Sequence, residues 1–244
     1  EYFHQMDPYQ HPIVIHTYPN RKQEIYGAHI GPESPLDGAS LQTSAMDMTN
    51  HNQVKEWIHK SDTAGKTWVV ALDEPGSANI GTPVDTFSGS PDRHDVRKYA
   101  MWGTFMAGGQ GFELYFGYQQ PHSDLNLTSF RSRDTIWDYA RHVKSFFSDH
   151  IPFTEMNSHD KLLAQGKGYC LAKPGEIYAL YLFNGSGKLD LTRETGSFSV
   201  QWFNPRRGGK LQEGSVKEVS GGEMVSLGNP PGEADQDWAV LVKR

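Results

Sequence analysis

The sequence predicts an α/β domain followed by an all-β domain, on two observations. Residues 1–152 alternate short apolar strands with amphipathic helices, which is typical of parallel strands joined by right-handed helical crossovers. Residues 159–244 contain short apolar segments separated by Gly, Asn and Pro, which is typical of a small antiparallel β-sandwich. We therefore expect one α/β domain and one accessory β-domain, with the change of character just after Pro152.

Four strands are expected in the α/β domain, at residues 13–16, 40–44, 67–74 and 112–118. The third contains five consecutive apolar residues without alternation, which is the pattern of a strand buried on both faces of a parallel sheet. Four strand–helix units amount to half of an eight-stranded, TIM-type (β/α)8 barrel. The same pattern also fits a small open sheet.

Helices are expected between these strands. One begins at Asn50 or Asn52, because asparagine is a good N-cap residue. A second opens at Pro91, and the longest carries its apolar face at residues 136–147 with helical spacing. A long polar loop at residues 77–90 follows the third strand, and a loop of this length usually serves a site.

Composition excludes several classes of function. With 244 residues and a formal charge of −6, the chain shows no basic face for nucleic acid. No apolar run approaches the roughly 20 residues that a membrane span requires. The single cysteine, Cys170, rules out an internal disulfide framework and a cysteine-rich metal site. No spacing of His, Asp and Glu indicates a metal centre and no glycine-rich loop follows a strand, so no cofactor is expected.

The N-terminal residues lack the features of a protein start. Residues 1–6 have neither the charged nor the apolar region of a signal peptide, and they look like the end of a helix. We therefore expect the 244 residues to be a fragment or a processed piece of a longer chain.

Asp73 and Glu74 end the apolar third strand, and Pro75-Gly76 follows as a turn signal. Acids at the carboxyl end of a buried parallel strand are where α/β barrels keep their chemistry. Glycoside hydrolysis needs two carboxyl groups, one to protonate the leaving oxygen and one to attack the anomeric carbon or activate water. Glu74 is the candidate for one of them, whereas Asp73 has the opposite pleat direction and is expected to point into the structure. The alternative is that both acids only solubilise a turn.

Other candidates for substrate binding lie near the same strand ends. Glu113 falls inside the expected fourth strand, where an acid must be paired or neutral, so a structural salt bridge is the simpler interpretation and a site role the alternative. His16 ends the first strand, and Asp47 follows the second with a weaker claim. Tyr115 and Tyr118 either stack on sugar rings or pack in the core, and packing is the stronger expectation for Tyr115.

Several stretches resemble known protein families. The segments 11–17, 68–74, 102–109 and 113–118 resemble the later strands of apiosidase-like (DUF4038-type) glycoside hydrolase barrels. The segments 169–172, 202–206 and 237–241 resemble the β-domain described as a "putative collagen-binding domain of a collagenase". The resemblance covers nearly the whole chain, and it implies the C-terminal half of a barrel followed by that β-domain.

The resemblance also implies a role for Glu74 and a partner for the chain. Glu74 would end barrel strand seven, where related barrels place the nucleophile or base. The partner acid would lie on strand four, in an N-terminal half-barrel that precedes Glu1, so these residues alone are expected to be inactive. A secreted or periplasmic bacterial protein is implied, with a carbohydrate substrate as its partner.

Three functional hypotheses follow. The first is a fragment of a glycoside hydrolase acting on a plant or algal polysaccharide or oligosaccharide. The second is a carbohydrate- or protein-binding module with a non-catalytic barrel scaffold, which exposure of Trp202 and Tyr181 on one sheet face would favour. The third is that the β-domain only braces the barrel, which the aromatic residues Phe146, Phe147 and Phe153 near the boundary favour.

Overall fold

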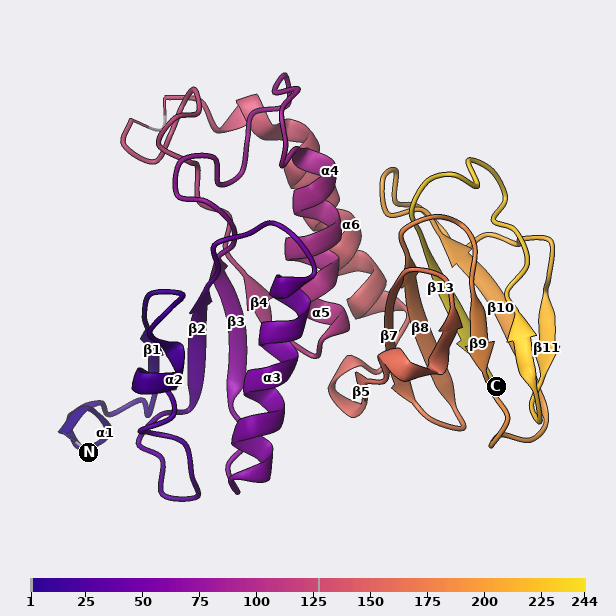
Figure 1. Ribbon diagram of the computed structural model, residues 1–244, viewed down its shortest axis with the longest axis horizontal. Coiled ribbons are helices and arrows are strands. Elements are labelled where there is room, and N and C mark those ends of the chain that lie inside the picture. The colour runs from indigo at the N-terminus through magenta and orange to yellow at the C-terminus, as the bar shows by residue number, and fades with distance from the viewer. Residues whose placement is uncertain (1, 127) are drawn as a thin grey trace. The chain divides into compact units, whose positions relative to one another are not determined.

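The computed structural model describes residues 2–126 and 128–244 (Figure 1). Glu1, where the expected N-terminal helix end begins, lies outside these residues, and Tyr2–Met6 form the short helix α1. None of the helices within the described ranges has the length and the apolar character that crossing a bilayer requires.

The chain divides into two units. The first runs to Ala100 and resumes over Gly109–Arg133, and the second contains Met101–Gly108 and Asp134–Arg244. The helix that precedes Pro152 therefore groups with the C-terminal strands. The domain limits at residues 152 and 159 stay a prediction.

A four-stranded parallel sheet forms the centre of the first unit. Its strands follow one another in sequence order: β1 (Val14–His16), β2 (Gly38–Gln42), β3 (Val69–Glu74) and β4 (Gly111–Phe112). The first three strands are confirmed close to their predicted positions. The fourth is much shorter than predicted, because the chain leaves the sheet after Phe112 and Phe116 pairs instead with Gly81 in the loop after β3.

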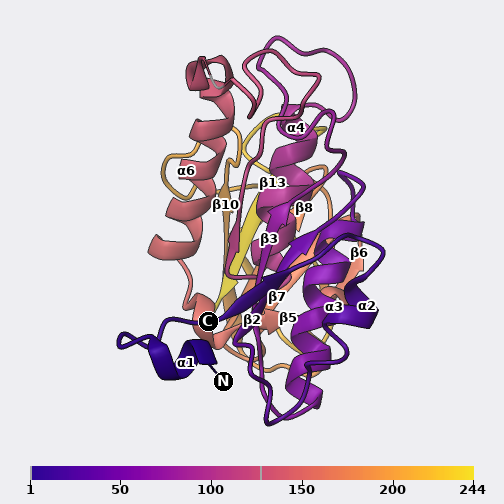
Figure 2. The ribbon, with the colours of Figure 1, turned by 90° about the vertical axis from the view of Figure 1, so that its left-hand side faces the viewer.

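Helical segments connect these strands. They are α2 (Lys22–Ile25), α3 (Thr49–Thr63), α4 (Arg93–Asp95), the π-helical segment η1 (Val96–Trp102), α5 (Gly103–Met106) and the 3-10 segment η2 (Phe130–Arg133). The start near Pro91 is confirmed, since the side chain of Asp92 caps α4 and Asp95 completes a capping box. Figure 2 shows α2 and α3 on the same side of β2 and β3.

Only one face of the parallel sheet is fully covered. Trp68, directly before β3, and Val70 and Leu72 of β3 are buried on the helical side, where Trp57 of α3 is also buried. Val69 on the opposite face is 44% exposed, and Val14 on β1 is 50% exposed. The prediction that β3 is buried on both faces is therefore wrong at Val69, because the described part of this unit does not cover that residue.

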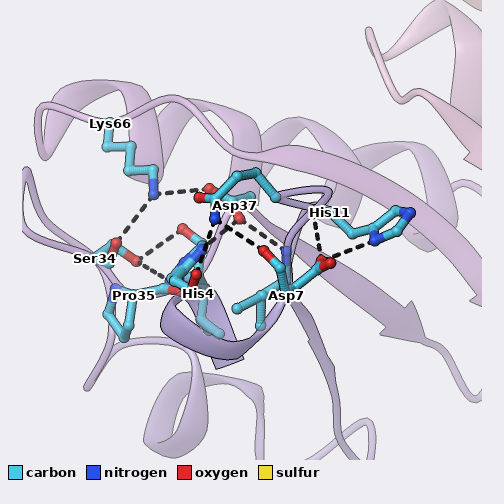
Figure 3. Close-up of polar contacts among 10 residues, drawn as sticks. His4, Asp7, His11, Ser34, Pro35, Asp37 and Lys66 are labelled. Atoms are coloured by element: carbon cyan, nitrogen blue, oxygen red, sulfur yellow. Dashed lines mark hydrogen bonds and ion pairs between the residues drawn. The ribbon is translucent and has the colours of Figure 1, made fainter. Parts of the chain in front are cut away.

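A polar network ties the N-terminal segment to the start of the sheet (Figure 3). The Asp37 carboxylate accepts hydrogen bonds from the Ile13 N–H at 2.8 Å and from Lys66 Nζ at 3.0 Å, and His4 lies 4.0 Å away. Burial works to raise the pKa of Asp37, but these hydrogen bonds and the Lys66 charge hold it below its ordinary value. Asp7 accepts hydrogen bonds from the N–H and the ring of His11 in the same way. The residues before β1 are thus fixed to the sheet.

Two antiparallel sheets form most of the second unit. The larger has the order β11-β10-β13-β8-β7-β5 and the smaller the order β12-β9-β6. The strands are β5 (Asn157–Ser158), β6 (Leu163–Gln165), β7 (Gly168–Lys173), β8 (Ile177–Leu182), β9 (Lys188–Asp190), β10 (Ser197–Phe203), β11 (Glu218–Ser220), β12 (Met224–Ser226) and β13 (Trp238–Lys243). The helical segments are α6 (Asp134–Asp149), η3 (Phe153–Glu155) and η4 (Asp160–Leu162).

One core lies between these two sheets. Leu180, Trp202 and Val240 of the larger sheet share a buried cluster with Leu189 and Val225 of the smaller one. Alternate residues of each strand enter this core, which is how a two-layer sandwich is stabilised. The antiparallel sheets expected from the frequent turns are present.

The other face of the larger sheet packs against helical residues of the same unit. The Trp102 ring stacks on Tyr181 with 4.7 Å between centroids, and Phe146 of α6 lies 5.3 Å from Phe203. Tyr181 and Trp202 are both 0% exposed. Their burial counts against the prediction that they form an exposed aromatic surface for ligands.

Candidate active site

The carboxyl ends of three neighbouring strands bring polar side chains together in the first unit. Gln42 of β2 donates an N–H to one Glu74 oxygen at 2.6 Å, and His16 Nε2 of β1 lies 3.6 Å from the other. The second ring nitrogen of His16 is 2.8 Å from the Ser40 hydroxyl. One oxygen of the Glu74 carboxylate is therefore hydrogen-bonded to the neighbouring strand β2, and the other faces His16 of β1.

A β-bulge gives Glu74 its direction. Leu41 of β2 pairs with Leu72 of β3, but the next residue, Gln42, pairs with Glu74 rather than with Asp73. Strict alternation would place Glu74 on the covered face with Leu72. The extra residue instead sets Glu74 beside Gln42, and bulges of this kind occur next to active sites, where they re-aim a side chain.

The Glu74 carboxylate is accessible. Its side chain is 42% exposed and that of His16 is 39% exposed. An ion pair at this exposure contributes little to stability, and it exists only while the imidazole is protonated. The group is thus oriented by its neighbours and open to a ligand.

A buried lysine supports the strand end that carries Gln42. Lys22 is 6% exposed, and its ammonium donates to the main-chain carbonyl of Gln42 at 2.5 Å and to the side chain of Gln53. Burial lowers the pKa of Lys22 to about 8, against the attraction of Glu56. The amphipathic pattern of the sequence gave no sign of this role, because a lysine in a short helix is usually solvated.

Glu113 directly follows β4 instead of lying inside a strand. Its N–H donates to the Leu72 carbonyl at 2.9 Å, so the residue sits at the same sheet edge as Glu74. Glu113 is exposed, and it forms no ion pair with any residue in the described ranges. Both its predicted place within a strand and the predicted structural salt bridge are therefore wrong, since the chain bends out of the sheet one residue earlier.

The environment of the Glu113 carboxyl raises its pKa. Partial burial raises its pKa first, and the negative charges of Asp73, Glu74 and Asp124 raise it further, while His16 opposes them. The neutral form of Glu113 is thereby favoured over a wider pH range than for a solvated glutamate.

The remaining predicted site residues lie around this edge in different environments. The Tyr115 hydroxyl donates to the Gly76 carbonyl at 3.0 Å, and burial followed by the charge of Glu74 raises the pKa of Tyr115. Tyr115 is partly buried, and its role in packing or in sugar stacking stays a prediction. Tyr118 is 58% exposed. Asp47 accepts the Thr49 N–H at 2.8 Å, which places it at the start of α3.

The loops that follow β3 and β4 pair with each other through their main chains. Thr82 N–H donates to the Tyr115 carbonyl at 2.8 Å, Tyr118 N–H to Ala78 at 3.0 Å and Gln119 N–H to Asn79 at 2.9 Å. We call residues 77–83 and 115–122 the paired loops. They extend from the strand ends that carry Glu74 and Glu113, so the expected position of the long loop beside the carboxylates is confirmed.

Sequence reasoning missed several residues of this region. Gln42 was signalled only by its place near the end of a strand candidate, and Arg133 by nothing more than a positive charge in a helix start. Asp124 accepts the Phe116 N–H at 2.8 Å and so shapes the second loop. Within the described ranges, no three His, Cys, Asp or Glu side chains are arranged to hold a metal ion.

Comparison with known proteins adds similarities in both units. Residues 154–243 match the family described as "Putative collagen-binding domain of a collagenase". The fold is similar to that of a glycoside hydrolase family 5 protein from Bacteroides vulgatus ATCC 8482, with a TM-score of 0.70 and 16% identity over 98% of this chain and 56% of that chain. It is also similar to a second solved structure titled "Glycoside hydrolase", with a TM-score of 0.67 and 14% identity over 96% of this chain and 58% of that one.

At 16% and 14% identity, the two structural similarities concern the fold alone. No curated protein matches the sequence. The chain spans a little more than half the length of the two solved glycoside hydrolases. It is a mixed α/β structure with antiparallel sheets, related in fold to glycoside hydrolases.

Proposed function

We propose that this chain is the C-terminal part of a glycoside hydrolase and that Glu74 is one of its two catalytic carboxylates. The observation that carries the proposal is the exposed Glu74 carboxylate, oriented by Gln42 and His16 at the carboxyl end of a parallel strand. Catalytic groups of (β/α)8 enzymes lie at this end of the strands. The fold similarity to glycoside hydrolases supports the same reading.

The parallel sheet is proposed to be half of a TIM-type barrel of the apiosidase-like group. Its strands run in sequence order, its helices α2 and α3 cover one face, and β1 forms an outer edge. The opposite face carries the exposed residues Val14 and Val69. A further half-barrel, in the complete protein, would pair with β1 and enclose that face.

Glu74 would act as nucleophile or as base, and the partner acid would come from the other half-barrel. The hydrogen bond from Gln42 would hold the carboxylate in place to attack a sugar or to activate water. His16 and Glu113 would contact substrate hydroxyl groups beside Glu74, and Asp47 is a more distant candidate for the same task. Tyr118 is accessible for stacking on a sugar ring, and Tyr115 would shape the site wall.

The substrate is proposed to be a plant or algal polysaccharide or oligosaccharide, degraded outside the cytoplasm by a secreted or periplasmic enzyme. The exposed polar strand ends fit hydroxyl-rich ligands. No part of this mechanism calls for a metal or an organic cofactor, because both catalytic groups are carboxyls.

Substitution of Glu74 in the complete protein tests the proposal. A panel of p-nitrophenyl glycosides and plant and algal polysaccharides identifies a hydrolysed substrate. Glu74→Gln should then lower kcat by at least about 100-fold, the lower end of what a positioned proton-transfer group contributes. Glu56→Gln is a matched control, because Glu56 is an exposed glutamate of α3 that forms an ion pair with Lys60 on the same helix. Turnover by Glu74→Gln at the rate of the control would remove Glu74 from the mechanism.

A further inference from the structure

Arg133 is a fully buried cation in the loop region above the candidate site. It is 0% exposed, and its guanidinium donates to three main-chain carbonyls: Thr82 at 2.7 Å, His122 at 3.2 Å and Pro121 at 3.2 Å. A fourth hydrogen bond, of 2.9 Å, goes to the Ser132 hydroxyl. Within the described ranges Arg133 forms no ion pair, so carbonyls rather than carboxylates satisfy this charge.

Burial of this cation has a cost that only full hydrogen bonding offsets. Burial lowers the pKa of Arg133, while Asp124 and Asp85 act in the opposite direction. The guanidinium also lies 3.9 Å from the centre of the Phe116 ring. A planar fork with five N–H groups can serve four acceptors in fixed directions at once, whereas a lysine ammonium has only three donors.

The segments that Arg133 joins are the paired loops. Thr82 belongs to the loop after β3, and Phe116, Pro121 and His122 belong to the loop after β4. The two loops approach so closely that a Cβ at Gly117 would lie 2.2 Å from the Ile80 carbonyl carbon. The loops are therefore a packed, preformed surface with Arg133 as the shared internal anchor.

The exposed ring of Tyr118 belongs to this surface. The Tyr118 N–H is fixed to the Ala78 carbonyl, and the Tyr115 hydroxyl joins the base of the loops to Gly76, two residues after Glu74. The position of the Tyr118 backbone relative to Glu74 therefore depends on the pairing that Arg133 secures. A main chain held in place before binding loses less conformational freedom when a ligand contacts the side chain that it carries.

We propose that Arg133 is a positioning residue that preforms a sugar subsite on the paired loops, where Tyr118 receives the C–H face of a sugar ring next to Glu74. The subsite part of this inference rests on the proposed function, and the positioning part does not. Arg133 acts through the loop main chain and touches no substrate. Its loss should weaken substrate binding more than it slows the chemical step, because Glu74 is held by β1 and β2 independently.

Hydrogen exchange in the complete protein tests the positioning part without a substrate. Arg133→Lys should raise the exchange rates of the Thr82, Tyr118 and Gln119 amides and leave the Thr43 amide, which bonds to the Glu74 carbonyl in the sheet, unchanged. Arg131→Lys is the matched control, because Arg131 is exposed two residues away. Unchanged exchange in all three loop amides would overturn the positioning role.

A second variant tests the same positioning role if Arg133→Lys does not fold. Phe116→Leu removes the ring below the guanidinium and leaves the four hydrogen bonds of Arg133 in place. It should raise exchange in the same three loop amides to a smaller extent. If these amides exchange as in the unsubstituted protein, the loops do not depend on this anchor and the proposal fails.

A double-mutant cycle tests the subsite, with KM and kcat measured on the p-nitrophenyl glycoside that the complete protein hydrolyses. Arg133→Lys should raise KM about tenfold in the presence of Tyr118 and less than about twofold in a Tyr118→Ala background, because both changes remove the same interaction. Equal effects in the two backgrounds would refute action through Tyr118. Failure to hydrolyse any glycoside would count against the proposed function, and the exchange rates would still decide whether Arg133 anchors the loops.

Discussion

Replacing Gly117 by alanine should separate the paired loops. The new Cβ would lie 2.2 Å from the Ile80 carbonyl carbon, 2.4 Å from the Ile80 oxygen and 2.5 Å from the Asn79 oxygen, all of them main-chain atoms. Real Cβ atoms do not approach below 3.0 Å, so one loop must move. The hydrogen bonds from Tyr118 to Ala78 and from Gln119 to Asn79 would then stretch or break.

The expected loss follows from these contacts. Overpacking costs about 1–3 kcal/mol and each of the two lost hydrogen bonds about 1 kcal/mol, so the free energy of unfolding should fall by roughly 3–5 kcal/mol. Urea denaturation followed by circular dichroism measures this change. Gly111→Ala is the control, because its Cβ would meet only the Ala71 Cβ at 3.9 Å, an ordinary contact. Equal stability of the Gly117→Ala and Gly111→Ala variants would refute the close approach of the two loops.

Two further substitutions test other parts of the structure. Trp102→Ala removes the ring that stacks on Tyr181, and the free energy of unfolding of the second unit should fall by roughly 3–5 kcal/mol in thermal or urea unfolding; a loss below about 1 kcal/mol would contradict this packing. Lys22→Met tests a buried charge: folded Lys22 releases its proton above about pH 8, whereas the unfolded chain keeps it to about pH 10.5. Wild-type stability should therefore rise relative to the variant between these pH values, and parallel pH profiles of the two proteins would contradict the burial of the ammonium.

Local apolar patterns in the sequence correctly predicted several strands and helices. The β-branched run ending at His16 and the apolar run ending at Glu74 are strands in the structure. The helix expected after Asn50 runs over Thr49–Thr63, and the apolar residues at helical spacing from Ile136 onward lie on α6. In each of these elements the signal is a run of apolar residues, consecutive or at helical spacing, within one segment, so the sequence of that segment is enough to predict it.

The errors concern features that depend on distant partners. The aromatic stretch after Phe112 has high β-propensity, but its main chain pairs with the loop around Gly81, which the stretch itself does not encode. The exposure of Val69 depends on which elements cover the sheet. The bulge at Asp73 depends on the register between β2 and β3. Burial on both faces was inferred from one strand alone, and it failed for that reason.

In the candidate site, too, residues with a local sequence signal were predicted and residues that act through distant contacts were missed. Glu74 was predicted because an acid at the end of an apolar strand is a local signal, and His16 shares that property. Gln42 and Lys22 support this region through contacts 32 and 20 residues apart in sequence, and Arg133 reaches Thr82 across 51 residues. No spacing rule links such residues. Only the folded chain brings them to one edge of the sheet.

Chemical rescue of Glu74→Ala in the complete protein is the most direct measurement of the central claim. The hydrolysis rate is compared with and without sodium azide, with Glu56→Ala as the control. We expect Glu74→Ala to lose turnover and to regain aglycone release with azide. The small anion occupies the space of the missing carboxylate and attacks the anomeric carbon, the glycosidic C–O bond breaks, and the aglycone leaves with a proton from the partner acid, giving a glycosyl azide. Hydrolysis by Glu74→Ala at the rate of the control, without azide, would contradict a catalytic role for this carboxylate.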